Sequence, residues 1–218
     1  LGAAGMKMYK AKTLDKLMAI CKKNQLFTIA DEVMTGFGKT GKTFACDYLA
    51  EKPDMMCLSK ALTGGTIPMA ITTFTEEIYA GFLSEDVNKA LFHGHTFTAN
   101  PTGCAAALAS ISLLENETMQ NNINRINEKH IAFQNYISQH PKVKTTRVLG
   151  VILALEIKTE NQESYYGNLR NRLYDFFIDK GIILRPVGNI VYILPPYVIE
   201  NKQLEKIYSV IEEALTLV

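Results

Sequence analysis

The chain has 218 residues, 47% of them hydrophobic, and 23 Lys and Arg against 22 Asp and Glu leave a formal net charge of +1. This balance gives no electrostatic reason to expect binding to nucleic acid or to an anionic membrane surface. No apolar stretch reaches the roughly 18 residues that span a bilayer. Four isolated cysteines without a Cys-x-x-Cys pair are typical of buried free thiols in a reducing compartment. We therefore expect a globular, cytoplasmic protein.

The early part of the chain shows alternating helical and strand patterns. Thr13 is a candidate N-cap for a helix whose apolar face begins at Leu14 and which ends near Asn24. Two short apolar runs, residues 26–30 and 55–58, are bounded by polar residues and predict buried strands. Helical sequence around two such strands indicates an α/β domain.

Further helices are predicted from their start signals. A short helix is expected over residues 45–50, and Thr75 is a candidate cap for another. Asn100 followed by Pro101 is a strong helix start, with Asn as the cap and Pro in the first turn. The following helix, over residues 103–114, is rich in Ala and can pack closely on a sheet or a cofactor.

The pattern of the chain changes after Glu115. Apolar residues at helical spacing predict a long helix from Met119 to Ile137, with His130 packed on its apolar face. We place a domain boundary near residue 116. Residues 1–116 then form part of an α/β domain, and residues 117–218 form a small α+β domain. The other expected elements here are strands over residues 148–157, 182–184 and 190–194, a helix over 169–177 before Gly181, and a helix over 204–215.

Asp31 and Lys60 are the candidate catalytic pair, because each comes after one of the two short apolar runs. Ligands of open α/β sheets bind outside the carboxyl ends of parallel strands, so an acid and an amine there can meet one ligand. Pyridoxal phosphate needs an amine that condenses with its aldehyde and an acid that keeps its ring nitrogen protonated. The simpler alternative is a solvated loop lysine and a turn aspartate.

A competing motif indicates nucleotide binding. Residues 36–43, Gly-Phe-Gly-Lys-Thr-Gly-Lys-Thr, match the P-loop pattern in every position. A P-loop needs a strand that leads directly into its first Gly and a helix that opens at Lys-Thr. Here residues 31–35 intervene, and the acidic pair Asp31 and Glu32 would repel phosphates. The P-loop interpretation is therefore the weaker one.

Three segments resemble the pyridoxal phosphate-dependent class III aminotransferases. Residues 31–41 resemble the acid-and-glycine segment of that family, residues 59–65 its cofactor-lysine segment, and residues 93–101 its phosphate-contact loop. The resemblance covers essentially the whole chain. It implies the pyridoxal phosphate-dependent transferase fold type I. The chain would supply part of the large α/β domain, with a mostly parallel sheet and helices, and the small α+β C-terminal domain.

The resemblance also implies roles for single residues. Lys60 would attach the cofactor and later move a proton, and Asp31 would pair with the ring nitrogen. Thr96, with the backbone near His95, would contact the cofactor phosphate of a neighbouring subunit, which implies a homodimer with shared sites. No metal is implied, since two histidines in one loop without a third ligand do not make a metal site.

Residues 185–197 are similar to the C-terminal signature of one branch of the class. That branch transfers an amino group from S-adenosylmethionine to 8-amino-7-oxononanoate in biotin biosynthesis. Gly94 would lie against the substrate, Arg185 would bind the carboxylate of the keto acid, and Tyr192 would line the same pocket. The guanidinium of Arg suits a carboxylate better than the ammonium of Lys, because it can donate two parallel hydrogen bonds.

Some features depart from the family pattern. His95 stands where well-known members have Pro, and Lys39 stands where Arg is usual. The chain starts at Leu1 rather than Met, and it lacks the glycine–serine phosphate segment and the ring-stacking aromatic expected from the family's N-terminal half. We therefore expect a piece of a longer enzyme. The alternatives left open are another class III enzyme acting on ω-amino acids, and a non-catalytic dimerisation fragment.

Overall fold

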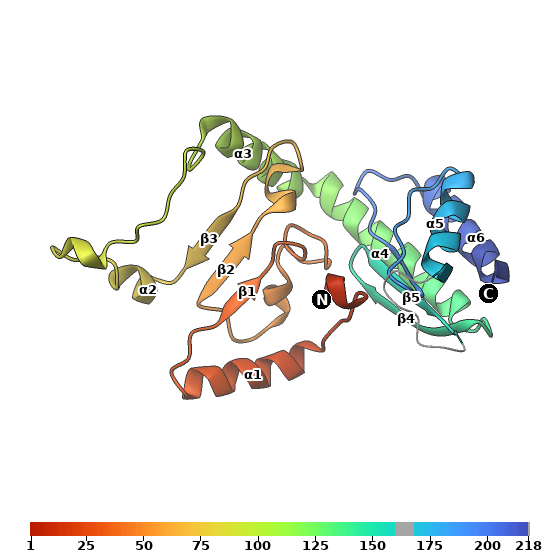
Figure 1. Ribbon diagram of the computed structural model, residues 1–218, viewed down its shortest axis with the longest axis horizontal. Helices are drawn as coiled ribbons and strands as arrows, with labels where there is room; N and C mark the ends of the chain where they lie inside the picture. The colour runs from red at the N-terminus through yellow and green to blue at the C-terminus, as the bar shows by residue number, and fades with distance from the viewer. Residues whose placement is uncertain (160–167, 218) are drawn as a thin grey trace. The chain divides into compact units, whose positions relative to one another are not determined.

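The computed structural model describes residues 1–159 and 168–217 (Figure 1). It divides into two compact units, which are called the N-terminal unit and the C-terminal unit below. The last passage of the chain from one unit to the other lies between Asn116 and Glu117, and earlier passages lie after Met8, Gly38 and Gly41. The division into the two domains expected from the sequence stays a prediction. The N-terminal unit comprises Tyr9–Gly38 and Lys42–Asn116; the C-terminal unit comprises Leu1–Met8, Lys39–Gly41 and Glu117–Val218.

The sheet of the N-terminal unit has the strand order β1-β2-β3 (Figure 1). Its strands are β1 (Ile29–Asp31), β2 (Met55–Leu58) and β3 (Ile71–Phe74). The pair β1–β2 is parallel and the pair β2–β3 is antiparallel. The two strands predicted around residues 26–30 and 55–58 are therefore confirmed as neighbours in one sheet.

The prediction that both strands are buried is wrong for β1. Ile29 is 62% exposed, and Leu26, just before the strand, is 58% exposed. The physical reason is that β1 is the edge strand of its sheet and, among the described strands, pairs with β2 alone. Strand β2 is more enclosed, and its last residue, Leu58, is buried.

Three α-helices accompany this sheet: α1 (Ala11–Lys23), α2 (Glu76–Ala80) and α3 (Pro101–Glu115). Helix α3 begins as predicted, since the Asn100 side chain accepts a hydrogen bond from the Gly103 amide at 2.7 Å. The prediction of Thr13 as the cap of α1 is wrong. The cap is Lys10, whose carbonyl accepts the Thr13 amide at 2.9 Å, so Thr13 already lies in the first turn.

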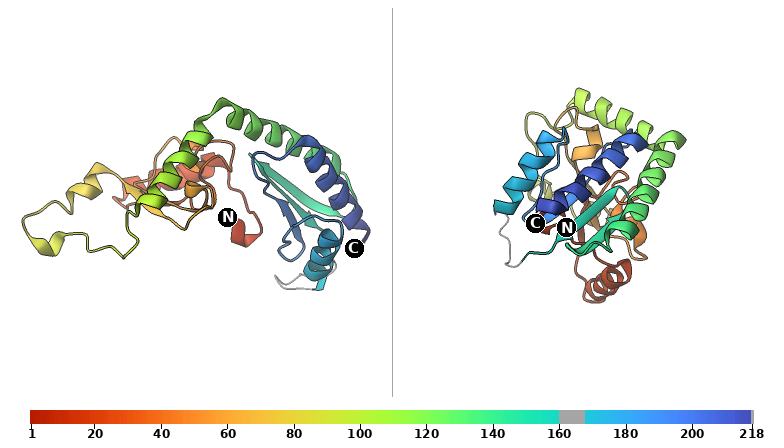
Figure 2. Two further views of the ribbon diagram at one scale, coloured as in Figure 1. Left: turned by 90° about the horizontal axis from the view of Figure 1, so that it is seen from above. Right: turned by 90° about the vertical axis from the view of Figure 1, so that its right-hand side faces the viewer.

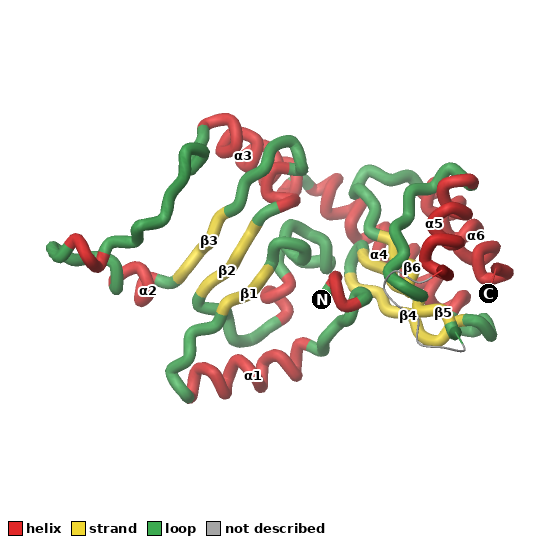
Figure 3. The backbone as a smooth tube through the Cα atoms, in the orientation of Figure 1, coloured by secondary structure: helices red, strands yellow, loops and turns green. Residues whose placement is uncertain are grey.

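Short 3₁₀ helices appear as well (Figure 3). The helix expected over residues 45–50 is present as one of these, shortened to four residues. Their bounds are η1 (Gly2–Ala4), η2 (Ala45–Tyr48), η3 (Lys60–Thr63), η4 (Val87–Lys89) and η5 (Leu215–Leu217).

The C-terminal unit is built on a second three-stranded sheet, with the order β4-β5-β6 and antiparallel pairing throughout. Helix α4 packs along β4 and β5 and also contacts α6, and α5 contacts α6 (Figure 2). The core of this unit is formed by the buried central strand β5 and by the apolar face of α4. The bounds are β4 (Val143–Leu149), β5 (Ile152–Ile157), β6 (Ile190–Ile193), α4 (Glu117–Ile137), α5 (Asn168–Asp179) and α6 (Asn201–Ala214).

Two strand predictions in this unit are wrong. The single strand expected over residues 148–157 is an antiparallel hairpin that reverses at Gly150, whose φ of +58° is a left-handed conformation favouring glycine. A Cβ on Gly150 would also lie 2.2 Å from the Gly41 amide nitrogen. Residues 182–184 form no strand, because this segment pairs with none of the strands in the described residues.

His130 is a core histidine of the C-terminal unit, as expected. It is fully buried, its Nδ1 lies 2.7 Å from the Tyr208 hydroxyl, and its Nε2 lies 3.1 Å from the Val151 carbonyl oxygen. A carbonyl can only accept, so Nε2 carries the proton and Nδ1 accepts from Tyr208. Burial lowers the pKa of His130 to about 4. The ring is therefore neutral in the folded unit near pH 7.

No helix among the described residues is long and apolar enough to cross a membrane.

Candidate functional site

Asp31 ends one strand of the N-terminal unit and Lys60 follows another, both at the same end of the sheet, the carboxyl-terminal end of these strands. Asp31 is the last residue of β1 and lies opposite Cys57 of the parallel strand β2. Lys60 comes three positions after Cys57 and opens the 3₁₀ helix η3. Both side chains are exposed. An acid and an amine therefore follow two neighbouring parallel strands at their carboxyl ends, where ligands of such sheets bind.

The backbone of Lys60 is held in an uncommon conformation. Its φ is +48°, in the left-handed region that non-glycine residues seldom occupy. Hydrogen bonds fix the residues on either side: the Ser59 hydroxyl donates to the Met69 carbonyl at 2.8 Å, and the Ser110 hydroxyl of α3 donates to the Ala61 carbonyl at 2.9 Å. Hydrogen bonds that hold an uncommon backbone conformation are typical of functional sites, where a side chain must point in one direction.

Asp31 is oriented by its own turn. Its Oδ1 accepts a hydrogen bond from the Val33 amide at 3.1 Å. Just beyond it, the Glu32 amide donates to the Cys57 carbonyl at 3.0 Å and extends the pairing of the two strands by one residue. The carboxylate of Asp31 thus stands at a well-defined strand end.

Glu32 is a buried carboxylate whose importance the sequence reasoning missed. Its side chain accepts hydrogen bonds from the Ala45 amide at 3.0 Å, the Cys46 amide at 2.7 Å and the Thr35 hydroxyl. Only 2% of the residue is exposed. A carboxylate is this deeply buried only when hydrogen bonds or a counter-charge offset its lost hydration. The sequence signal was the acid itself, placed directly before a loop rich in donors.

The loop that contains Gly94, His95 and Thr96 is exposed and hydrogen-bonded within itself. The His95 amide donates to the Thr98 hydroxyl at 2.8 Å, and the Phe97 amide donates to His95 Nδ1 at 3.1 Å. Within the part of the chain that the structure describes, these residues form no hydrogen bond with the candidate catalytic pair. The phosphate role predicted for this loop stays a prediction.

Arg185 and Tyr192 belong to the C-terminal unit. Arg185 is exposed and sits between buried Leu184 and buried Pro186, so the chain on both sides is anchored in the core. Tyr192 is half-buried in β6, opposite Ala154 of β5. The other predicted site residues lie in the N-terminal unit.

Lys39 was noted from the sequence only as a departure from the family pattern. In the structure its ammonium lies 4.3 Å from the centre of the Tyr197 ring, within range of a cation–π interaction. Burial lowers the pKa of Lys39 and raises the pKa of Tyr197. The Lys39 carbonyl also accepts the Val151 amide at 3.1 Å. The segment Lys39–Gly41 is therefore fixed to the β4–β5 turn of the C-terminal unit.

The structure contradicts the P-loop alternative. After residues 36–43 the chain forms a four-residue 3₁₀ helix rather than the α-helix that a P-loop requires. The amides of Ala45 and Cys46, just after the motif, donate to Glu32. The Lys42 ammonium donates to the Asp47 carbonyl at 3.0 Å. These donors are already used within the fold.

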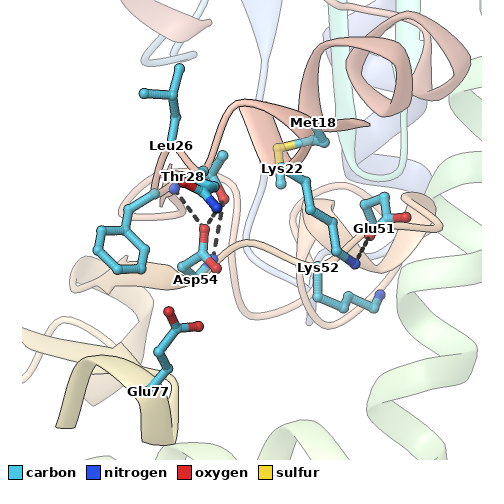
Figure 4. Close-up of a pocket in the computed structure, with 10 residues that line it drawn as sticks. Met18, Lys22, Leu26, Thr28, Glu51, Lys52, Asp54 and Glu77 are labelled. Atoms are coloured by element: carbon cyan, nitrogen blue, oxygen red, sulfur yellow. Dashed lines mark hydrogen bonds and ion pairs between the residues drawn. The ribbon is translucent and has the colours of Figure 1, made fainter. Parts of the chain in front are cut away.

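A pocket of about 280 Å³ lies where β1 and β2 begin (Figure 4). Asp31 and Lys60 lie at or just beyond the opposite ends of these two parallel strands. The Thr28 amide and hydroxyl both donate to Asp54 Oδ2 at 2.7 Å, and these bonds lower the pKa of Asp54. Lys22 and Glu51 form an exposed ion pair of 2.9 Å at its rim. The polar groups here tie the strand starts together, and no predicted site residue lines the pocket.

Comparisons with known proteins place these features in a family. The model of the family described as "Aminotransferase class-III" matches residues 1–215. The adenosylmethionine-8-amino-7-oxononanoate aminotransferase of Synechococcus elongatus is 41% identical over 215 residues, which are 98% of this chain and 50% of that protein. The chain thus spans about half the length of the curated relatives it matches.

Solved structures agree with this result. The chain is similar, with a TM-score of 0.91 and 35% identity, to the crystal structure of adenosylmethionine-8-amino-7-oxononanoate aminotransferase from Methanocaldococcus jannaschii, over 99% of this chain and 51% of that one. An amine transaminase from an uncultivated Pseudomonas species, solved in its PLP-bound form, matches with a TM-score of 0.89 and 27% identity, over 98% of this chain and 50% of that one. The predicted transferase fold is confirmed.

Proposed function

The chain belongs to the class-III aminotransferase family, and on that premise we propose that it is the part of a pyridoxal phosphate-dependent aminotransferase that carries the catalytic lysine and its partner acid. The observation that supports this most directly is the register of β1 and β2. It sets Asp31 opposite Cys57, so the acid and Lys60 leave the sheet at one edge. The amine transaminase from Pseudomonas, a relative with the same fold, is solved with PLP bound.

The groups at this edge fit pyridoxal phosphate. When bound, the cofactor withdraws electrons from the amine-bearing carbon of a substrate. The Asp31 carboxylate, exposed and held by the Val33 amide, would keep a proton on the ring nitrogen. The Lys60 amine would form the covalent link and then move a proton at the substrate carbon. The structure fixes the backbone on both sides of Lys60, which favours such a directed role.

We propose that the substrates are S-adenosylmethionine as amino donor and 8-amino-7-oxononanoate as acceptor, with 7,8-diaminononanoate as product in biotin biosynthesis. Support comes from the names of the relatives that are 32–41% identical to this chain. Arg185, exposed between two buried residues, would bind the acceptor carboxylate. Tyr192 would line the pocket of the acceptor. Gly94 has no side chain and would leave room for the acceptor.

We also propose a cytoplasmic homodimer in which each chain completes the site of its partner. Among the described residues, the exposed loop around His95 and Thr96 forms hydrogen bonds only within itself, although the resemblance gives it the cofactor phosphate as ligand. A cofactor bound by the partner chain would give this exposed loop the phosphate that the resemblance assigns to it. This proposal predicts that Thr96→Val weakens cofactor binding in the dimer without disturbing the fold of either unit.

A second candidate is transfer from an ω-amino acid or a simple amine. It is favoured by the likeness to an ω-transaminase from Pseudomonas jessenii, which matches with a TM-score of 0.89 at 26% identity. A non-catalytic dimerisation fragment is the remaining alternative. The two catalytic candidates differ in which donor converts the bound cofactor to its amine form.

The deciding experiment uses the whole enzyme loaded with pyridoxal phosphate. The conversion to the amine form is followed spectroscopically with S-adenosylmethionine, with β-alanine and with a simple primary amine. We expect S-adenosylmethionine to react, and 8-amino-7-oxononanoate to restore the original spectrum. A response to β-alanine or the amine alone would support the second candidate. No response to any donor would contradict both catalytic candidates.

A further inference from the structure

Glu32 is a buried acid that the proposed chemistry does not use. It follows the candidate cofactor acid Asp31 directly, yet the two carboxylates have opposite surroundings. Asp31 is exposed, whereas Glu32 is 2% exposed and surrounded by neutral donors. Among the described residues no lysine or arginine forms an ion pair with Glu32. Burying a charge without a counter-ion is unfavourable, so the site must depend on hydrogen bonds.

The three donors to Glu32 come from two separate parts of the loop that follows β1. The Thr35 hydroxyl closes a turn over residues 32–35 from one side. The Ala45 and Cys46 amides, at 3.0 and 2.7 Å, fasten the start of the 3₁₀ helix η2 from the other. The Glu32 carboxylate, just after β1, thus holds both Thr35 at the start of the glycine-rich loop and the Ala45–Cys46 segment that follows the loop.

The hydrogen bonds of Glu32 are connected to the Asp31 carboxylate through one backbone amide, that of Val33. The Val33 amide that donates to Asp31 at 3.1 Å lies inside the turn that Glu32 and Thr35 close. The same turn is tight at its end, because the Gly36 amide donates to the Glu32 carbonyl at 2.9 Å, and a Cβ on Gly36 would lie 2.9 Å from that oxygen. If the turn opened, the Val33 amide would lose its fixed direction.

We propose that Glu32 is a positioning residue, which holds the Asp31 carboxylate in the direction needed to pair with a cofactor ring nitrogen. This inference rests on the proposed function, because it assigns Asp31 that partner. Glu32 touches neither substrate nor cofactor. It acts through Thr35 and Val33, and its buried charge is satisfied by the loop it organises.

Substitution of Glu32 by Gln keeps the size of the side chain but places an NH₂ group where the structure offers an N–H or O–H donor. The Thr35 hydroxyl can also accept from that NH₂ group, so the hydrogen bond that must be lost is the one from the Ala45 amide or the one from the Cys46 amide. Small errors in the placement of a catalytic group can lower rates by about 100-fold. We expect Glu32→Gln to lower kcat of the donor half-reaction between about 10- and 100-fold, with little change in KM.

The test compares four variants of the whole holoenzyme with the wild type. Glu32→Gln removes one backbone amide bond that anchors the loop, and Thr35→Val removes the hydroxyl bond, while Thr35→Ser keeps the hydroxyl. Asp47→Asn is the matched control, since the Asp47 carboxylate accepts the Phe44 amide at 2.9 Å in the same loop but makes no bond to residues 32–35. The readouts are kcat, KM, the melting temperature and the ¹⁵N chemical shift of labelled cofactor, which reports protonation of the ring nitrogen.

The proposal expects reduced kcat and a shifted ring-nitrogen signal for Glu32→Gln and Thr35→Val, with both restored in Thr35→Ser and unchanged in Asp47→Asn. A merely structural Glu32 would lower the melting temperature and leave the nitrogen signal unchanged, which would overturn it. If Glu32→Gln does not fold, Thr35→Val decides by the same readouts. A wild type without cofactor binding would overturn the proposed function as well, whereas an active wild type with unaffected variants would overturn this inference alone.

Discussion

Asp31 lies directly opposite Cys57 across the parallel strands β1 and β2. Because Lys60 follows Cys57 by three residues, this register brings a carboxylate and an amine to one edge of the sheet. The two residues are far apart in sequence, and the pairing of two short strands is what brings them to the same end of the sheet. The proposed chemistry depends on this pairing.

Asp31→Asn tests the role of the acid. An amide can still accept the Val33 amide hydrogen, so the fold and its melting temperature should change little. A neutral side chain cannot balance a charged ring nitrogen, and removing one such electrostatic group commonly raises the barrier by about 3 kcal/mol, or roughly 100-fold in rate. Single-turnover kinetics of the whole enzyme measure this. Near-normal turnover would exclude the pairing with the ring nitrogen.

Arg185→Lys tests the assignment of the acceptor carboxylate. Lysine keeps the charge but cannot donate two parallel hydrogen bonds to a carboxylate. We expect KM for the keto acid to rise about tenfold, which corresponds to roughly 1.4 kcal/mol of binding, while the donor half-reaction stays near normal. Equal damage to both half-reactions would indicate a structural arginine.

The His130–Tyr208 pair predicts a pH-dependent stability. Burial lowers the pKa of His130 from 6.5 to about 4, so the folded unit binds this proton less readily than the unfolded chain. The stability is therefore complete above pH 6.5 and decreases as the pH falls towards 4, by an amount on the order of a few kcal/mol.

Urea unfolding at pH 7 and pH 5, followed by circular dichroism, checks this expectation. His130→Gln is the control, because its amide can donate to the Val151 carbonyl but does not titrate. The variant should be less stable at pH 7 and should lose less stability between the two pH values. An equal loss in both proteins would assign the pH dependence to other groups.

Gly150→Ala should destabilise the C-terminal unit strongly. The new Cβ would lie 2.2 Å from backbone atoms of both Thr40 and Gly41, and φ at this position is +58°. Gly181→Ala is the matched control, since its φ is +70° but the nearest atom is the flexible end of Lys206 at 3.7 Å. The control carries only the backbone penalty of about 1–2 kcal/mol, and Gly150→Ala should exceed it by roughly 1–3 kcal/mol of overpacking. Equal urea midpoints would refute the close approach.

Helices and their ends were predictable where the signal was local. Asn100 and Pro101 mark the start of α3 because a side-chain cap and a missing amide hydrogen act within one turn. Periodicity likewise identified α4, whose buried residues include His130. Strand ends were less predictable. Gly150 within the apolar run is a local signal for a break in the strand, but the close approach of Lys39–Gly41 to this glycine is a contact distant in sequence that no local pattern records.

The candidate site was predictable in part for the same reason. The positions of Asp31 and Lys60 after apolar runs were visible in the sequence, but their shared edge follows from strand pairing. The burial of Glu32 was not visible, because its donors lie as far away as Cys46. The exposure of β1 was also missed, since an apolar run predicts burial whether or not other elements cover the strand.

Reduction of the whole, cofactor-loaded enzyme with borohydride, followed by peptide mapping, tests the central claim most directly. The account predicts that pyridoxyl is fixed on Lys60 and that Lys60→Ala yields no labelled peptide. Lys42 and Lys52 of the same unit provide internal comparisons, because Lys42 donates to the Asp47 carbonyl and Lys52 to the Cys46 carbonyl. Label on a peptide that lacks Lys60, or an unlabelled enzyme that still transaminates, would contradict the account.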